Sequence, residues 1–194
     1  MIKEAYLNKI NIRGEISTFK IKGDLKLDTK TFADLNVVDL LRQYRLTGNK
    51  KILSFLKEQG LLLEVTEKQN LIVTAGLNVI TRLLSGDTTY SGEINDGAVG
   101  TGASPSPVVG DTTLDTELYR NAKVSAAASS NIAFVDFVYA AGDWNGTATE
   151  FANFIDGDGT GNPDTGQMFS YIATGGWTKS SSESLFVSCK YTIN

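Results

Sequence analysis

Hydrophobic residues recur at helical spacing in three stretches of the first 86 residues. The first stretch starts at Phe32 and ends at Gly48, the second covers residues 49–59, and the third covers residues 71–86, with its start between positions 71 and 75. The first two stretches follow each other directly, which predicts a helical hairpin. Its apolar stripe either packs into the core or forms a docking surface for another subunit.

Strand-like segments lie on both sides of these helices. In the first part of the chain they cover residues 5–12, 16–22 and 61–65. After Gly86 the sequence changes to short β-prone runs separated by Gly, Asn, Asp, Ser and Thr. These runs predict six strands, over residues 97–102, 123–128, 132–140, 147–155, 168–174 and 185–193.

Three of the later segments carry more detailed signals. The last strand alternates, and the residues on its apolar face are Leu185, Val187, Cys189, Tyr191 and Ile193. The run over residues 134–139 is mostly apolar at both odd and even positions, which indicates burial on both faces. The D-W-N-G sequence at residues 143–146 is a tight-turn signal and predicts a hairpin between the strands that flank it.

These elements predict an α+β fold. We expect a C-terminal antiparallel β-sandwich, preceded by an N-terminal region with short strands and the helical hairpin. Charge and glycine content suggest a division near residue 70. Residues 1–70 carry 13 Lys and Arg against 9 Asp and Glu, whereas residues 71–194 carry 5 against 13. We therefore predict an α+β docking region over residues 1–70 and a helix followed by the sandwich over residues 71–194.

Composition excludes several functions. The chain has no histidine, which removes Ser-His-Asp and Cys-His catalysis and the commonest metal ligand. Its single cysteine, Cys189, allows no disulfide within the chain, and we expect it to be a small buried residue. No apolar run approaches the roughly 20 residues of a membrane helix, and no secretory signal is evident. The acidic C-terminal part argues against nucleic acid as a partner.

Several short motifs occur in an order that resembles a module of tailed-bacteriophage virion proteins. Such modules have an N-L-I-V-x-x-G-x-N-x-I helix, a strand ending in G-T-G, a Pro-containing spacer, D-T-x-L-x-x-E-x-x-R, N-G, T-E-F and a closing strand. The matching segments here are residues 70–80, 99–102, 111–120, 145–146, 149–151 and 185–193. The resemblance covers about residues 61–194. One departure is that T-E-F leads into Ala-Asn-Phe, where such modules commonly have Gly-Leu-Phe.

The resemblance implies a non-enzymatic structural protein of a phage particle. Such a protein is made in the host cytoplasm, resides in the virion, and assembles through subunit interfaces in the tail, neck or baseplate. It also implies other virion proteins as partners and a homo-oligomer. The alternative is a β-sandwich module that decorates the capsid or binds a glycan or protein on the host surface. A hydrolase that uses carboxylates alone has no positive support in the sequence.

Two groups of residues are candidate sites. Glu117 and Arg120 have i, i+3 spacing and pair on one face if the segment is helical, either within the fold or between subunits. Core packing is the default for the aromatic residues of the predicted strands and turns. Trp144 lies in the predicted turn, so we expect it to be the most exposed of them, as part of an interface or a sugar-binding face.

The loop D-G-D-G-T-G-N-P-D resembles the first part of a calcium-binding loop. Asp156, Asp158, Thr160 and Asp164 occupy relative positions 1, 3, 5 and 9, and oxygen donors at such positions can surround Ca²⁺. Position 12 is Gln167 instead of a bidentate Glu, so a polar hairpin tip is the alternative. The sequence indicates no other cofactor.

Overall fold

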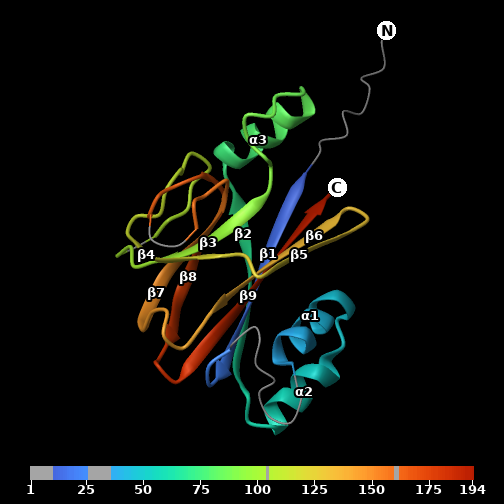
Figure 1. Ribbon diagram of the computed structural model, residues 1–194, viewed down its shortest axis with the longest axis vertical. Coiled ribbons are helices and arrows are strands. Elements are labelled where there is room, and N and C mark those ends of the chain that lie inside the picture. Colours follow the sequence, from blue (N-terminus) through green and yellow to red (C-terminus); the bar gives the residue numbers. More distant parts are fainter. Residues whose placement is uncertain (1–10, 26–35, 104, 160–161) are drawn as a thin grey trace.

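The computed structural model describes residues 11–25, 36–103, 105–159 and 162–194, and the chain forms a β-rich body there with helices on its outside (Figure 1). The described helices are α1 (Val37–Thr47), α2 (Lys50–Glu58) and α3 (Thr74–Leu84). The described strands are β1 (Ile12–Lys22), β2 (Leu62–Ile72), β3 (Ile94–Gly100), β4 (Glu117–Ala122), β5 (Ser125–Ser129), β6 (Ile132–Tyr139), β7 (Gly146–Ile155), β8 (Gln167–Lys179) and β9 (Glu183–Ile193).

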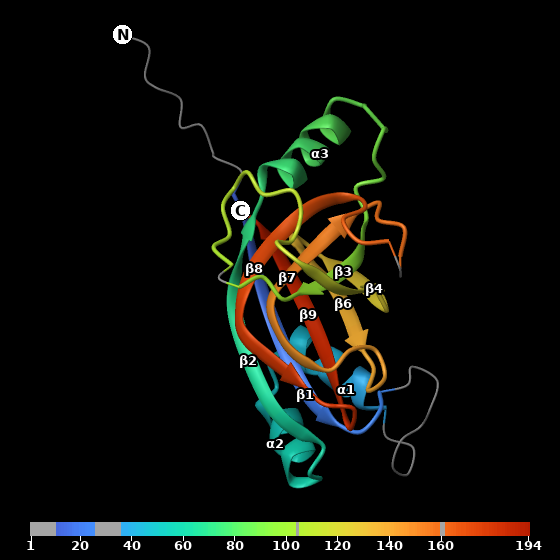
Figure 2. The same ribbon diagram turned by 90° about the vertical axis from the view of Figure 1, so that its left-hand side faces the viewer.

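The described strands form one antiparallel sheet with the order β4-β3-β7-β8-β2-β1-β9-β6-β5. The sheet curls so that its two halves face each other (Figure 2). The strand β2 joins the halves, because residues 62–70 pair with β1 while Leu71 and Ile72 pair with β8. The predicted combination of antiparallel strands with a few helices is confirmed. The strands belong to one continuous curled sheet, however, instead of the two separate sheets of a clear sandwich.

A kinked segment connects the two ends of this sheet. The strands β4 and β5 are separated only by Lys123 and Val124, yet β4 pairs with β3 and β5 pairs with β6 at the opposite end. The backbone N–H of Lys123 donates to the carbonyl of Asn95 (2.7 Å), and that of Val124 donates to the carbonyl of Asp136 (2.8 Å). The segment thereby brings the two ends of the sheet together.

The interior between the two halves holds the main core. Phe151 of β7 meets Phe137 of β6 edge-on, with ring centroids 6.1 Å apart, and also contacts Trp177 of β8 at 5.5 Å. The predicted face of β9 is confirmed in this core for Leu185, Val187, Cys189 and Tyr191, whereas Ile193 is 50% exposed. The predicted burial of β6 on both faces is also confirmed, because residues 134–139 are all buried.

The helical hairpin covers the outer face of β1, β2, β6 and β9. Leu41 of α1 and Leu56 of α2 are fully buried in a cluster with Phe19 and Phe186. The apolar stripe of the hairpin therefore packs into a core, which is one of the two predicted roles. Asn36 and Asn49 cap the two helices by accepting backbone N–H hydrogen bonds. The first helix starts at Val37, and the part predicted over residues 32–35 lies outside the described residues.

One local prediction is wrong, and one condition is not met. Glu117 and Arg120 were expected to pair on one face if their segment is helical, and the segment is the strand β4, because β3 supplies a backbone partner for it. The D-W-N-G segment does not close a hairpin, since β6 pairs with β5 and β9 while β7 pairs with β3 and β8. The chain crosses from one half of the sheet to the other at this point. The strand predicted over residues 5–12 lies mostly outside the described residues.

The division near residue 70 stays a prediction. That boundary falls inside β2, and β1 lies between β2 and β9 in the sheet. Strands from both predicted regions are therefore neighbours over their full length, with β1 residues from Ile12 to Lys22 paired to β9.

Candidate functional site

A buried carboxylate on β7 holds the loop between β3 and β4 against the sheet. Glu150 is fully buried, and its Oε1 accepts hydrogen bonds from the backbone N–H groups of Gly102 (2.9 Å) and Thr116 (3.0 Å). Its Oε2 accepts from the N–H of Asp115 (3.0 Å) and the hydroxyl of Tyr171 (2.5 Å). Burial and the bond to Glu150 raise the pKa of Tyr171, so the phenol remains a donor. Four donors thus compensate the burial of one carboxylate.

Three motifs of the resemblance meet at this carboxylate. The G-T-G segment and the D-T-x-L-x-x-E-x-x-R segment supply its backbone donors, and T-E-F contains Glu150 itself. The neighbouring Thr149 donates to the carbonyl of Gly102 (2.7 Å). A Cβ atom on Gly100 would lie only 2.5 Å from Oε1 of Glu150, so glycine is needed there for the close approach. The motif order along the chain therefore corresponds to one packed unit.

The predicted pair of Glu117 and Arg120 is present, on a strand. Nε and Nη2 of Arg120 donate to the two carboxylate oxygens of Glu117, both at 2.8 Å, and the side chains are 1% and 4% exposed. Nη1 also donates to Asp96 (3.4 Å) and to the carbonyl of Thr165 (2.8 Å). The guanidinium carbon lies 4.1 Å from the ring centroid of Phe154. Burial alone would lower the pKa of Arg120, but the two carboxylates raise it. This geometry is pairing within the fold.

The aspartates of the predicted calcium loop make hydrogen bonds within the chain. The carboxylate of Asp156 accepts from the backbone N–H of Ser91 (2.8 Å) and from the Ser91 hydroxyl. The carboxylate of Asp158 accepts from Oγ1 of Thr165 (2.8 Å), and this bond contributes most to lowering the pKa of Asp158. The two carboxylates therefore have separate partners instead of converging on one point.

The remaining predicted ligands are Asp164 and Thr160. Asp164 donates its backbone N–H to Glu117 (3.0 Å), which fixes the loop to the Arg120 cluster. Thr160 lies outside the described residues. In the described ranges, no group of three or more His, Cys, Asp or Glu side chains is arranged to hold a metal ion. The strands β7 and β8 on either side of this segment pair antiparallel, which agrees with the alternative of a polar hairpin tip.

Trp144 is buried, so its predicted exposure is wrong. It is 5% exposed and packs edge-on against Tyr139, with ring centroids 6.4 Å apart. The Nζ atom of Lys179 lies 5.6 Å from the centroid of one of its rings. The indole enters the interior because its segment crosses between the two halves of the sheet. It offers no exposed platform for stacking on a sugar.

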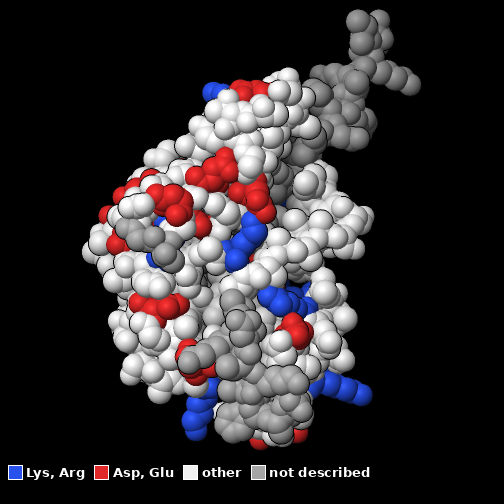
Figure 3. Space-filling model, in the orientation of Figure 1, with Lys and Arg blue, Asp and Glu red and all other residues white. Residues whose placement is uncertain are grey.

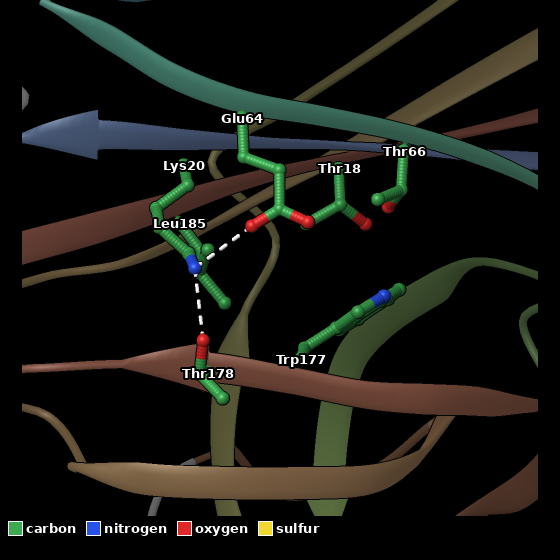
Figure 4. Close-up of a pocket in the computed structure, with 7 residues that line it drawn as sticks. All are labelled: Thr18, Lys20, Glu64, Thr66, Trp177, Thr178 and Leu185. Atoms are coloured by element: carbon green, nitrogen blue, oxygen red, sulfur yellow. Dashed lines mark hydrogen bonds and ion pairs between the residues drawn. The ribbon is translucent and has the colours of Figure 1, made fainter.

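A narrow slot lies between β1, β2 and the end of β8 (Figure 4). Nζ of Lys20 crosses this slot, with Oε2 of Glu64 at 2.8 Å and Oγ1 of Thr178 at 2.9 Å. The slot holds about 10 Å³, which is room for about one water molecule. Its polar groups therefore join the two halves of the sheet and leave no space for a ligand.

An apolar hollow opens between α3, the start of β3 and the hairpin of β5 and β6. Its volume is about 220 Å³. Ile12, Ile80 and Ala133 line it together with the core residues Val135 and Phe169. Part of the interior core is thus accessible from outside at this point.

The strand that borders the hollow has small, uncharged side chains. β5 reads Ser-Ala-Ala-Ala-Ser, and its residues from Ala126 to Ser129 are exposed. The projecting tip of the β5–β6 hairpin is white in Figure 3, whereas acidic side chains gather over the half that holds β3 and β4. On α3, Leu77 and Leu84 are 42% and 78% exposed. The open edge of β5 and the apolar hollow together form the candidate interaction surface.

Comparisons with known proteins give no assignment. No family model, no curated protein and no solved structure matches this chain. None of the helices in the described ranges has the length and apolar character of a membrane span. The functional argument therefore depends on the geometry and on the motif resemblance.

Sequence reasoning missed two buried carboxylates and the open edge. Glu150 interrupts a mostly apolar strand, and that interruption was the available signal, whereas Asp96 lies in the polar Asn-Asp-Gly start of β3 and gives no such signal. The uncharged Ser125–Ser129 run was identified as a strand, but nothing in the sequence placed it at the end of the sheet.

Proposed function

We propose that this chain is a non-enzymatic structural protein of a tailed-bacteriophage particle, assembling through subunit interfaces in the tail, neck or baseplate. The observation that carries the proposal is the meeting of three resemblance motifs at Glu150. If the motifs matched the module by chance, there would be no reason for all three to contact the same buried carboxylate. Their convergence supports the interpretation that they belong to one inherited packed unit.

The chemistry of the buried polar groups is in accord with a structural role. Glu150 binds three backbone N–H groups, and Arg120 binds two carboxylates and a backbone carbonyl. The Glu150 contacts fix the loop between β3 and β4 to the sheet, and the bond of Arg120 to Thr165 fixes the loop between β7 and β8. A rigid body with an exposed apolar surface is what repeated assembly into a particle requires.

Mass spectrometry of purified particles tests this proposal. The particles are isolated by density-gradient centrifugation from the lysate of a host that carries the gene. We expect the chain to co-purify with the particles in a fixed ratio to their major proteins. Its exclusive recovery from the particle-free fraction would overturn the proposal.

A further inference from the structure

We infer that copies of this chain bind head to tail, with the basic outer face of α2 in one copy against the acidic loop between β3 and β4 in the next. This inference rests on the proposed function, because it names the surfaces through which the subunit contacts its own copies. Three features of the structure lead to it: unpaired lysines around an exposed aromatic ring on α2, unpaired aspartates beside exposed valines on the loop, and the separation of the two surfaces in the molecule.

The outer face of α2 is basic and partly apolar. Leu56 points into the hydrophobic cluster beneath the helix, whereas Lys50, Lys51 and Lys57 are exposed. Phe55 follows Lys51 by one turn on the same face and is 36% exposed. None of the three lysines forms an ion pair with another described residue. These charges are therefore available to a partner.

The helix itself does not balance two of these lysines. Lys50 and Lys51 lie in the first turn of α2, and that turn contains no acidic residue. The N-terminal end of a helix carries a partial positive charge, so two further cations there are unfavourable in the free subunit. An acidic surface placed against this turn removes that repulsion.

The loop between β3 and β4 has the opposite charge. Residues 83–119 contain six acidic residues and no Lys or Arg. Within the loop, Asp115 is exposed and Asp111 is half-buried, and neither carboxylate forms an ion pair with a described residue. Val108 and Val109 of the same loop are 55% and 58% exposed. Exposed apolar side chains next to charged ones are typical of a protein–protein interface, where they form its centre and its rim.

Hydrogen bonds hold this loop in a fixed position. The buried carboxylate of Glu150 binds backbone N–H groups at both ends of the loop. The N–H of Thr74, at the start of α3, donates to the carbonyl of Val109 (2.7 Å). The N–H of Val108 donates to the carboxylate of Asp111 (2.8 Å). A surface that is fixed before it binds loses little conformational entropy in the complex.

The two surfaces lie too far apart to meet within one molecule. The helix α2 lies at one end of the β-rich body, whereas the loop lies beside the start of α3 in the other half (Figure 1, Figure 2). Figure 3 shows the same separation of charge, with acidic side chains over the half that holds β3 and β4 and basic side chains projecting near α2. Each copy thus carries both complementary surfaces, and a contact of this heterologous kind repeats from copy to copy into a ring or a filament.

Sedimentation velocity of the full chain tests the inference. At about 20 mM NaCl we expect concentration-dependent association, which should weaken at least about tenfold at roughly 500 mM NaCl because salt screens contacts between exposed charges.

Two double variants locate the contact. Lys50→Glu with Lys51→Glu reverses the charge of the helix face, and acidic residues are favourable in a first turn. Thr113→Lys with Asp115→Lys makes the loop basic and leaves Asp111 in place. Each variant alone should associate at least about tenfold more weakly than the parent chain, at an unchanged melting temperature.

A mixture of the two variants gives the sharpest test. The helix variant keeps the acidic loop and the loop variant keeps the basic helix, so we expect an equimolar mixture to associate as strongly as the parent chain. This gain of association cannot come from misfolding. Arg13→Glu with Lys68→Glu is the matched control for the helix variant, since it makes the same change in net charge at exposed residues outside α2. We expect the control to associate at most about twofold more weakly than the parent chain.

Several results would overturn the inference. One is a parent chain that stays monomeric up to roughly 0.1 mM at low salt, as it would if the partner were another protein. Others are association of either variant equal to that of the parent chain, which would place the contact on another face, and a control that loses as much association as the helix variant. The last is a mixture that stays monomeric although both variants keep the melting temperature of the parent chain.

These outcomes are separate from those for the proposed function. If the chain is found in particles but does not associate with itself, only the head-to-tail contact is wrong. If it associates as expected while it is absent from particles, only the proposed function fails.

Discussion

Replacing Glu150 with glutamine tests whether one side chain holds the loop between β3 and β4. The substitution keeps the size of the side chain but replaces one acceptor oxygen with an NH₂ donor. All four groups around Glu150 are donors in the native protein: three backbone N–H groups and the hydroxyl of Tyr171. The hydroxyl can turn and accept from the new amide. In the better of the two amide orientations, the N–H of Asp115 then faces another donor.

The expected loss of stability follows from these contacts. A hydrogen bond to a charged group contributes about 1.5–3 kcal/mol, and a buried donor left without a partner costs about 1–3 kcal/mol. One bond is lost with its donor unpartnered, and the bonds that remain lose their charge assistance. We therefore expect Glu150→Gln to lower the free energy of unfolding by about 3–5 kcal/mol, a large part of the usual 5–15 kcal/mol of a domain.

Urea unfolding and amide hydrogen exchange measure this effect. Besides the lower unfolding midpoint, the backbone amides of Gly102, Asp115 and Thr116 should exchange faster than in the native chain. Glu64→Gln is the matched control, since Glu64 also pairs on a strand but its side chain is 53% exposed. We expect that control to lose less than about 1 kcal/mol. If the two variants unfold at the same urea concentration with the three amides still protected, the reasoning about Glu150 is refuted.

Three other predictions follow from the buried and loop residues. Arg120→Ala leaves Glu117 and Asp96 buried without their counter-charge and should cost about 3–5 kcal/mol in urea unfolding; a loss no larger than that of Glu64→Gln would contradict this. Calorimetry with about 1 mM Ca²⁺ should give no heat of binding, because Asp156 and Asp158 accept hydrogen bonds from Ser91 and Thr165. A heat of binding that is lost in the Asp158→Asn variant would show that the loop does bind the metal. Burial raises the pKa of the Cys189 thiol from 9.0 to about 12, so its contribution to stability is complete below pH 9.0 and is lost as the pH rises toward 12. Between these values Cys189→Ala should reduce the pH dependence of the unfolding free energy by about 1.4 kcal/mol per pH unit, and equal slopes in the two proteins would refute the assignment.

Elements with a strong apolar period could be predicted from the sequence, and elements defined by their partners could not. The stripe of Leu41 and Leu56 and the cap Asn49 are local signals, so the two helices lie near their predicted positions, although the first helix begins after a cap, Asn36, that lies inside its predicted range. The strand β2 continues far beyond its predicted end at residue 65. Its second half, Thr66 to Asn70, is polar and largely exposed, and it is a strand because β1 supplies the backbone hydrogen bonds.

The candidate site shows the same division. The motif order indicated that the segments around residues 99–102, 111–120 and 149–151 belong together, but not through which atoms. Glu150 binds backbone groups 34 to 48 positions away, and their N–H groups carry no signal in the sequence. The pairing of Glu117 with Arg120 was predicted from helical spacing and occurs on a strand. On the strand, Arg120 also contacts Asp96 and the carbonyl of Thr165. These two residues are far from Arg120 in the sequence, so a spacing rule could not predict them.

The two ends of the sheet differ in a way that favours an external partner. At β4, Glu117 and Arg120 fix the edge strand to the loop after β7 through hydrogen bonds to Asp164 and Thr165. At β5, the edge has neither charged side chains nor proline, which are the usual protections against unwanted pairing. The kink at Lys123 and Val124 turns β5 away from β3, so pairing along this edge requires a strand from elsewhere. An uncharged edge beside an accessible core is a liability in a free subunit, because it can pair with other chains, and this liability is removed if a partner covers it.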